Sequence, residues 1–217
     1  AGGRSVGVPG IVAMMEKMHK KHGVLPWEEL FVDAINLSEN GFEVSPKLAL
    51  AIKNKQNPAL GRYKEAWEYF FPNDEPLKAK SIKTNKKLAK TFKRIALLGS
   101  KGFYKGEIAI DIVKAVQNAK DNPGLLTNED LIQYQAIERD VICAKYKKYK
   151  LCGMGPPTSG GMSVIQIIKM LEDKNLNKYK PLSAEVVHLI TQSSKLAFAD
   201  RAQYMADADF VNVPVTG

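Results

Sequence analysis

Arginine, histidine and cysteine are scarce in this chain of 217 residues. Only five of its 32 basic residues are arginine, and it has three histidines and two cysteines. Recognition of phosphates and bases favours arginine forks gathered in one patch, so the formal charge of +9 does not indicate a nucleic-acid partner. The densest basic stretch, residues 87–94, alternates lysine with Leu88 and Phe92 at helical spacing, which is typical of a solvated helix face. We therefore predict no binding of nucleic acid.

Long apolar runs are missing as well. No run of about 18 apolar residues occurs, so we predict no membrane span. The opening residues, AGGRSVGVPG, lack the apolar stretch of a signal peptide, and we expect any export signal to precede them. With 45% hydrophobic residues, the chain nevertheless has enough apolar side chains to bury a core.

Prolines and glycines mark where helices begin and end in the first part of the chain. A proline in the first turn of a helix loses no hydrogen bond, and a glycine past the last turn adopts a left-handed conformation at little cost. Together with the apolar spacing, such signals predict helices that begin at Pro9, Pro26, Pro46 and Pro58, one capped by Thr84, one from Tyr104, and a capping box of Thr127 and Asp130.

Further along the chain the pattern becomes an alternation of polar and apolar residues on both sides of Lys147 and Lys148. This alternation predicts a β-hairpin near residues 138–154 with a two-residue loop, and counting outward from the loop places Cys143 opposite Cys152. A tight hairpin turn favours glycine, so Lys148 should make the turn costlier or change its type.

Two long helices are predicted after the hairpin, roughly over residues 160–173 and 183–205. The predicted fold class is therefore mainly α with a small antiparallel β element. We treat residues 1–217 as a single helical unit that contains the hairpin.

The segment GPPTSGG, residues 155–161, joins the hairpin to the next helix. A serine nucleophile needs a base within hydrogen-bond reach and a third group that orients the base. No histidine has a spacing that ties it to Ser159, and a GxSxG elbow is absent, so a catalytic Ser159 is disfavoured. An anion could bind the free N–H groups at the helix start. A structural corner is favoured over both, with Thr158 or Ser159 as the helix cap. Gly160 and Gly161 would then let a neighbouring backbone approach.

Other polar residues also have structural interpretations. His19 and His22 lie three residues apart on a predicted helix but lack the further ligands that a metal site requires. Asp207 and Asp209 follow a helix end, where turn capping explains them. Asp200 lies near an apolar helical stripe, which predicts a partly buried carboxylate held by hydrogen bonds. We predict no metal site and no cofactor.

Several blocks of the sequence form a recognisable series. They are VGVPG, GVLPW, GFEVS, GFYKGEIA, LLTNEDLIQY, YKKYKLCGMGPPTSGG and AFADRAQYMADADFVNVP. From about Ser5 to Pro214, their order and spacing resemble the large-subunit pattern of the γ-glutamyltranspeptidase family. No single block is decisive, but their combination is highly specific.

The resemblance implies a fragment of an N-terminal-nucleophile hydrolase with an αββα fold. The family's precursor is cut into a large and a small subunit, and the nucleophile is the threonine at the new amino terminus of the small one, whose own α-amine serves as base. The residues that hold the γ-glutamyl α-carboxylate lie outside the matched region, and Arg4 does not match the arginine among them. Six threonines are present, all internal: Thr84, Thr91, Thr127, Thr158, Thr191 and Thr216. We therefore predict no catalytic and no substrate-binding residue, and a chain that is inactive alone.

For the whole protein, the resemblance implies γ-glutamyl transfer or hydrolysis on glutathione and related γ-glutamyl amides. A glutamyl-enzyme intermediate would pass the group to water or to an amino acceptor. Alternatives within the family are an acylase and a poly-γ-glutamate enzyme. The alternative from another class is a basic helical module that binds an acidic partner.

The resemblance also implies partners and a location. The partners are the small subunit with its terminal threonine and a small γ-glutamyl substrate, and the parent protein would be periplasmic or secreted. A helical shell whose central sheet lies largely in other segments should expose an apolar patch larger than the few hundred Å² usual for a monomer. We therefore expect self-association through that surface.

The state of the two cysteines is a separate question. Opposed residues in an antiparallel ladder have Cα atoms about 4.5–5.5 Å apart, which a disulfide can bridge, and exported relatives would meet an oxidising compartment. Against a bond, the Cβ vectors of opposed residues run nearly parallel, and the closed loop is short. We expect two reduced thiols, Cys143 and Cys152, packed side by side.

Overall fold

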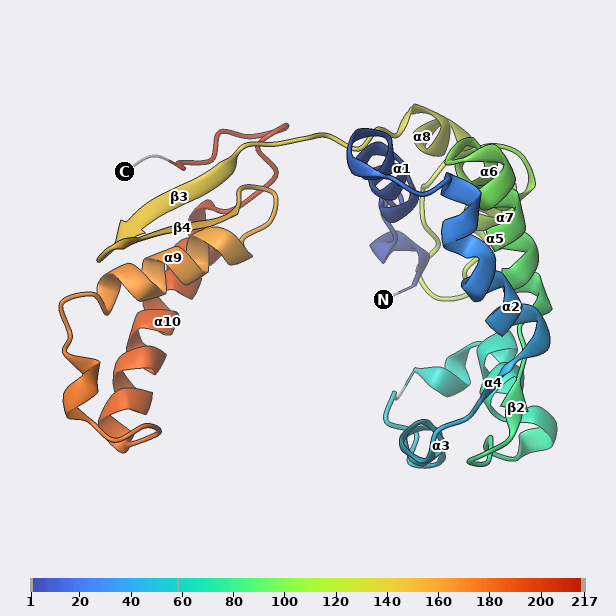
Figure 1. Cartoon of the computed structure of the whole chain (residues 1–217), viewed down its shortest axis with the longest axis horizontal. Coiled ribbons are helices and arrows are strands. Elements are labelled where there is room, and N and C mark those ends of the chain that lie inside the picture. Colours follow the sequence, from blue (N-terminus) through green and yellow to red (C-terminus); the bar gives the residue numbers. More distant parts are fainter. Residues whose placement is uncertain (1, 58, 216–217) are drawn as a thin grey trace. The chain divides into compact units, whose positions relative to one another are not determined.

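The structure, a computed structural model, describes residues 2–57 and 59–215. The chain divides into two compact units, Ala1–Ala136 and Ile137–Gly217, whereas the sequence was treated as one helical unit (Figure 1). Ala1, Pro58 and Thr216, which entered the sequence predictions, lie outside the described residues. No described helix has the length and apolar character that a membrane crossing requires.

The first unit is helical apart from a short antiparallel pairing of two strands, β1 (Phe42–Glu43) and β2 (Ile82–Lys83). Its α-helices are α1 (Ile11–His22), α2 (Val32–Asn40), α3 (Pro46–Lys53), α4 (Lys64–Phe70), α5 (Lys86–Leu98), α6 (Lys101–Tyr104), α7 (Glu107–Gln117) and α8 (Asn128–Gln133). Its 3-10 helices are η1 (Gly3–Ser5), η2 (Trp27–Phe31), η3 (Leu60–Arg62) and η4 (Pro72–Asp74).

Helix caps in this unit agree with the sequence in one case and differ in another. Thr127 and Asp130 form the predicted capping box at the start of α8. The cap of α5 is Asn85 rather than Thr84, because the Asn85 Oδ1 accepts the free backbone N–H of Leu88 at 3.0 Å. Both side chains are good caps, so adjacent candidates were not separable from sequence.

Two predicted helices are shorter than expected. One helix was predicted to begin at Tyr104, but this residue is the last of α6. The next helix, α7, begins at Glu107, after Gly106, whose φ is 74°. The predicted fourth helix, α4, begins only at Lys64.

The lysine-rich face of α5 is solvated, as the sequence predicted. Ala89 and Ile95 are buried, whereas Lys90 and Lys93 are exposed. Lys93 pairs with Glu39 of α2 at 2.5 Å, so part of this charge is balanced within the unit.

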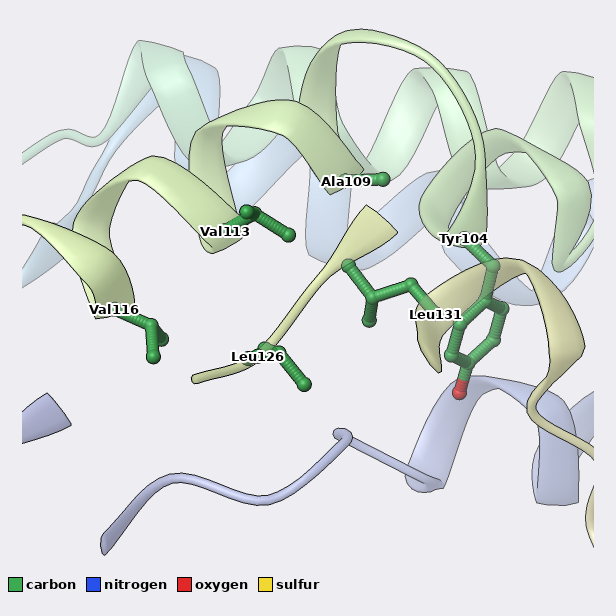
Figure 2. Packing of buried hydrophobic residues seen from close by; sticks show 6 residues of the cluster. All are labelled: Tyr104, Ala109, Val113, Val116, Leu126 and Leu131. Carbon is green, nitrogen blue, oxygen red and sulfur yellow. The ribbon is translucent and has the colours of Figure 1, made fainter. Parts of the chain in front are cut away.

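The core of the first unit lies where α6, α7 and α8 meet. Figure 2 shows the six buried side chains of this cluster: Tyr104, Ala109, Val113, Val116, Leu126 and Leu131. The Tyr104 hydroxyl donates to Pro9 O at 2.6 Å and accepts from Ala13 N at 3.2 Å. Burial raises the pKa of Tyr104, so the hydroxyl stays protonated and ties the start of α1 to the core.

The second unit consists of a hairpin and two α-helices. Strands β3 (Val141–Tyr146) and β4 (Tyr149–Met154) pair antiparallel in the predicted register, with Tyr146 opposite Tyr149 and Cys143 opposite Cys152. Helix α9 (Gly160–Met170), the short η5 (Leu176–Lys178) and α10 (Ala184–Tyr204) follow. Helix α9 packs against both the hairpin and α10.

Cys143 and Cys152 form a disulfide, so the expectation of two reduced thiols is wrong. Their Cα atoms lie 4.1 Å apart, near the short spacing of a non-hydrogen-bonded pair in an antiparallel ladder. The sequence argument gave too much weight to the parallel Cβ vectors, because at this close approach the two sulfurs come within bonding reach.

In the hairpin turn, the residue with the unfavourable backbone conformation is Lys147 and not Lys148. Lys147 has φ 51°, a left-handed conformation that side chains disfavour. Its backbone N–H donates to the Glu172 Oε1 at 2.9 Å, and the same carboxylate pairs with Lys169. These hydrogen bonds from Lys169 and Lys147 lower the pKa of Glu172, which keeps the carboxylate charged and the turn fastened to the end of α9.

Candidate functional site

Ser159 lies directly before α9, but no side-chain hydrogen bond caps this helix, so the predicted hydroxyl cap is wrong. The Ser159 Oγ accepts a hydrogen bond from the Arg201 Nε of α10 at 2.8 Å. A guanidinium stays protonated and cannot remove the proton of a serine. Within residues 2–57 and 59–215, Ser159 makes no hydrogen bond to a histidine or a carboxylate. The contact therefore serves to join the start of α9 to α10.

The two glycines after Ser159 play different parts. A Cβ on Gly161 would lie 2.6 Å from Met154 O and 2.8 Å from the carbonyl carbon of Gly153. Only glycine permits this approach, which confirms the predicted contact with a neighbouring backbone. A Cβ on Gly160 would meet nothing within 4 Å, so the prediction is wrong for that residue.

A hollow of about 390 Å³ lies within the second unit. It is lined by the hairpin, by α9 and α10, and by residues 205–215, the tail that follows α10. Its lining residues with polar groups are Gln166, Asp200, Arg201 and Tyr204. The Gln166 Nε2 donates to the Asp200 Oδ2 at 3.1 Å. The predicted hydrogen bonding of Asp200 is thus confirmed, but its predicted partial burial is wrong, because the residue faces this open hollow. The lining can orient a polar group but contains no paired nucleophile and base.

The tail after α10 is held by charged side chains. The Arg139 Nη1 donates to the Asp209 Oδ1 at 2.8 Å, and Nη2 binds the second carboxylate oxygen. The Asp209 N–H donates to the Asp207 Oδ1 at 3.0 Å, which confirms turn capping by Asp207. The hydrogen bonds between Arg139 and Asp209 lower the pKa of Asp209 and raise that of Arg139. Sequence reasoning missed this pair, because its partners lie 70 residues apart.

Of the three histidines, His19 has a packing contact. The His19 Nε2 lies 2.8 Å from Leu25 O, and its ring meets Trp27 edge-on. His22 is exposed, and His188 lines a shallow hollow beside α10. In the described part of the chain, no three His, Cys, Asp or Glu side chains are grouped so that they could hold a metal ion.

Comparison with known proteins decides the family. The model of the family described as gamma-glutamyltranspeptidase matches residues 1–217. The chain belongs to this family. The resemblance inferred from the sequence blocks is thereby confirmed.

Curated relatives of this γ-glutamyltranspeptidase chain are longer proteins. It is 36% identical over 208 residues to the glutathione hydrolase proenzyme of Escherichia coli (strain K12). It is 38% identical over 215 residues to the glutathione hydrolase proenzyme of Bacillus subtilis (strain 168). The alignments cover 96% and 99% of this chain but 35% and 36% of those relatives. The chain therefore spans about a third of their length.

Solved structures show the same γ-glutamyltranspeptidase fold. The Helicobacter pylori gamma-glutamyltranspeptidase superposes with a TM-score of 0.89 at 37% identity, covering 99% of this chain and 60% of that one. The Bacillus anthracis transpeptidase CapD gives 0.78 at 32% identity, covering 91% and 66%.

Proposed function

We propose that the chain is part of a γ-glutamyltransferase and glutathione hydrolase that acts on glutathione and related γ-glutamyl amides. The observation that carries this proposal is the match, over nearly the whole chain, to relatives named glutathione hydrolase proenzymes. In the proposed reaction a glutamyl-enzyme intermediate passes its group to water or to an amino acceptor. Residues 1–217 supply the helical scaffold of an N-terminal-nucleophile hydrolase with αββα layers.

The nucleophile in this proposal is a threonine of a separate small subunit. The word proenzyme in the relatives' names supports maturation by cleavage, which would free a threonine whose α-amine acts as its base. Threonines of this chain have local roles: Thr127 caps α8, and the Thr91 Oγ1 donates to Lys87 O at 3.3 Å. A periplasmic or secreted location is supported by the disulfide between Cys143 and Cys152, because disulfides persist in oxidising compartments.

Helix α10 is the surface that we propose the small subunit covers. Five of its large apolar side chains are 43–60% exposed: Val187, Ile190, Leu196, Phe198 and Tyr204. Removing apolar surface from water is favourable by about 25 cal/mol per Å². A partner that covers these side chains therefore gains binding free energy. Residues 1–217 produced without the small subunit should self-associate through this helix.

Release of nitroaniline from γ-glutamyl-p-nitroanilide tests the proposed function. The full protein should turn the substrate over and, with a dipeptide acceptor, form a γ-glutamyl dipeptide. Residues 1–217 alone should be inactive. Turnover by residues 1–217 that Ser159→Ala abolishes would overturn the proposal. If the full protein cleaved poly-γ-glutamate or an acylase substrate but not glutathione, that compound and not glutathione would be the substrate.

A further inference from the structure

We propose that Arg139 is a positioning residue for the cleavage that matures the proenzyme. Through Asp209 it fixes the tail after α10, and with the tail the place from which the chain continues toward the cleaved bond. This role rests on the proposed function, because the cleavage belongs to that function. It requires no exposed surface, since both partners of the contact belong to this chain.

The tail is fixed at two places. The Arg139 Nη1 donates to the Asp209 Oδ1 at 2.8 Å, and Nη2 binds the other carboxylate oxygen. Further along, Val213 is buried, at 7% exposure, whereas Phe210 between them is 85% exposed. Apolar packing therefore does not hold the tail at the level of the ion pair. A two-pronged guanidinium contact fixes direction as well as distance, so Arg139 sets where the tail lies after it leaves α10.

The anchored tail lies beside the first strand of the hairpin. Pro214 and Val215 line the same hollow as Ile142 and Ala144 of β3, and Arg139 lies just before that strand begins. The segment that enters β3 and the segment that follows α10 are thus tied together (Figure 1). Residues 209–215 are therefore fixed relative to β3.

The order of the subunits links this tail to the cleavage. A single cut gives a new amino terminus only to the fragment that follows it. In the proposed maturation that fragment is the small subunit, whose first residue is the threonine, so the cut bond lies after residues 1–217. The bond is hydrolysed: water supplies the hydroxyl of the new carboxyl group and a hydrogen to the nitrogen of the threonine. No other reactant is needed.

The anchor matters before the cut and not after it. In the proposed maturation the precursor cleaves itself, so the threonine and the peptide bond before it must be held in a reactive arrangement. A displacement of about 1 Å can slow such a reaction about a hundredfold. In the precursor the tail and the threonine belong to one continuous chain, and an anchor of the tail restricts where the threonine can lie. The cut ends this restriction, so Arg139 should act on maturation and not on turnover.

Conversion of the full-length precursor into two chains tests this role. The precursor is synthesised in a cell-free system, purified and incubated in buffer, and a denaturing gel follows the loss of the full-length band. Arg139→Gln and Asp209→Asn should each slow the conversion about tenfold. The control Asp173→Asn, which removes an exposed charge of the same unit, should be cleaved at the native rate.

Two further measurements separate positioning from a general loss of structure. Arg139→Asp combined with Asp209→Arg rebuilds the contact between guanidinium and carboxylate in the opposite sense, and it should restore most of the native cleavage rate. The cleaved fraction of each variant should release nitroaniline from γ-glutamyl-p-nitroanilide with the native kcat and KM, because the cut chain no longer joins the tail to the threonine.

The outcomes distinguish this role from the proposed function. A native precursor that stays uncleaved would overturn both. Cleavage of the native precursor with equal rates in Arg139→Gln and Asp209→Asn would overturn only the role of Arg139. A reversed pair as slow as the single variants would also overturn that role alone. So would a kcat that falls together with the cleavage rate, because a general distortion of the fold would lower both.

Discussion

Arg139 holds Asp209 with both of its terminal nitrogens, across 70 residues of sequence. The pair fastens the tail after α10 to the segment that enters β3. Next to it, the backbone N–H groups of Phe210 and Val211 donate to Asp207 O at 3.1 Å. Exposed ion pairs add little stability, but a two-pronged guanidinium contact fixes geometry. We infer that this pair positions the tail more than it stabilises the unit.

Breaking the pair should release the tail without unfolding α10. In Asp209→Asn or Arg139→Gln, the amides of Phe210 and Val211 should exchange with deuterium about tenfold faster, because their turn loses its anchor. Exchange of the α10 amides should not change. The control is Asp173→Asn, which removes an exposed charge of the same unit. Unchanged exchange at Phe210 in both variants of the pair would show that the turn holds the tail by itself.

Acid should have the same effect as the variants. Hydrogen bonds from Arg139 lower the pKa of Asp209, so its contribution is complete above the ordinary aspartate pKa of about 3.9. The contribution is lost as the pH falls through the lower pKa of the folded state. Exchange at Phe210, corrected for the intrinsic pH dependence, should therefore accelerate below about pH 3.9.

The Asp209→Asn variant separates this step from others. All other carboxylates are present in both proteins, so only the step that disappears in the variant belongs to Asp209. A step at or above about pH 5 would contradict the lowered pKa.

Local patterns made the hairpin predictable, whereas distant side-chain partners were not. Alternation and a two-residue loop fix the register, because a slip of one residue would place Cys143 and Cys152 on opposite faces of the hairpin. The partners of Ser159 and Arg139 leave no such signal, since α10 and the tail that follows it supply them only after folding.

The disulfide and the corner show where sequence reasoning reaches its limit. The bond between Cys143 and Cys152 depends on how closely two Cα atoms approach, which strand pairing alone specifies only within about 1 Å. The pair of glycines was predicted to allow a close contact, but nothing in the sequence distinguishes Gly160 from Gly161. The family could be predicted because its signal is spread over many blocks.

The core of the first unit should depend strongly on Leu131. This side chain is fully buried, at 0% exposure, whereas its neighbour Ile132 is 45% exposed. Leu131→Ala should lower the free energy of unfolding by about 2–5 kcal/mol, because it removes buried contacts and leaves a cavity. Ile132→Ala should cost less than about 1 kcal/mol.

Tryptophan fluorescence during urea unfolding measures this difference. Trp27 and Trp67 are the two tryptophans of the chain, and both lie in the first unit, so the signal reports that unit alone. Similar losses for Leu131→Ala and Ile132→Ala would contradict the assignment of the core.

The corner before α9 allows a test with two adjacent glycines. In Gly161→Ala the new methyl group would meet Met154 O at 2.6 Å and the carbonyl carbon of Gly153 at 2.8 Å. These are backbone atoms, which cannot rotate away, so the end of β4 and the start of α9 must separate at a cost of about 1–3 kcal/mol. In Gly160→Ala the methyl group would meet nothing within 4 Å, and alanine should stabilise the helix by up to about 1 kcal/mol.

Native-state hydrogen exchange of the α9 amides gives the free energy of opening for each variant. Opposite signs are expected, and an equal change in both would mean that the two elements do not touch at Gly161.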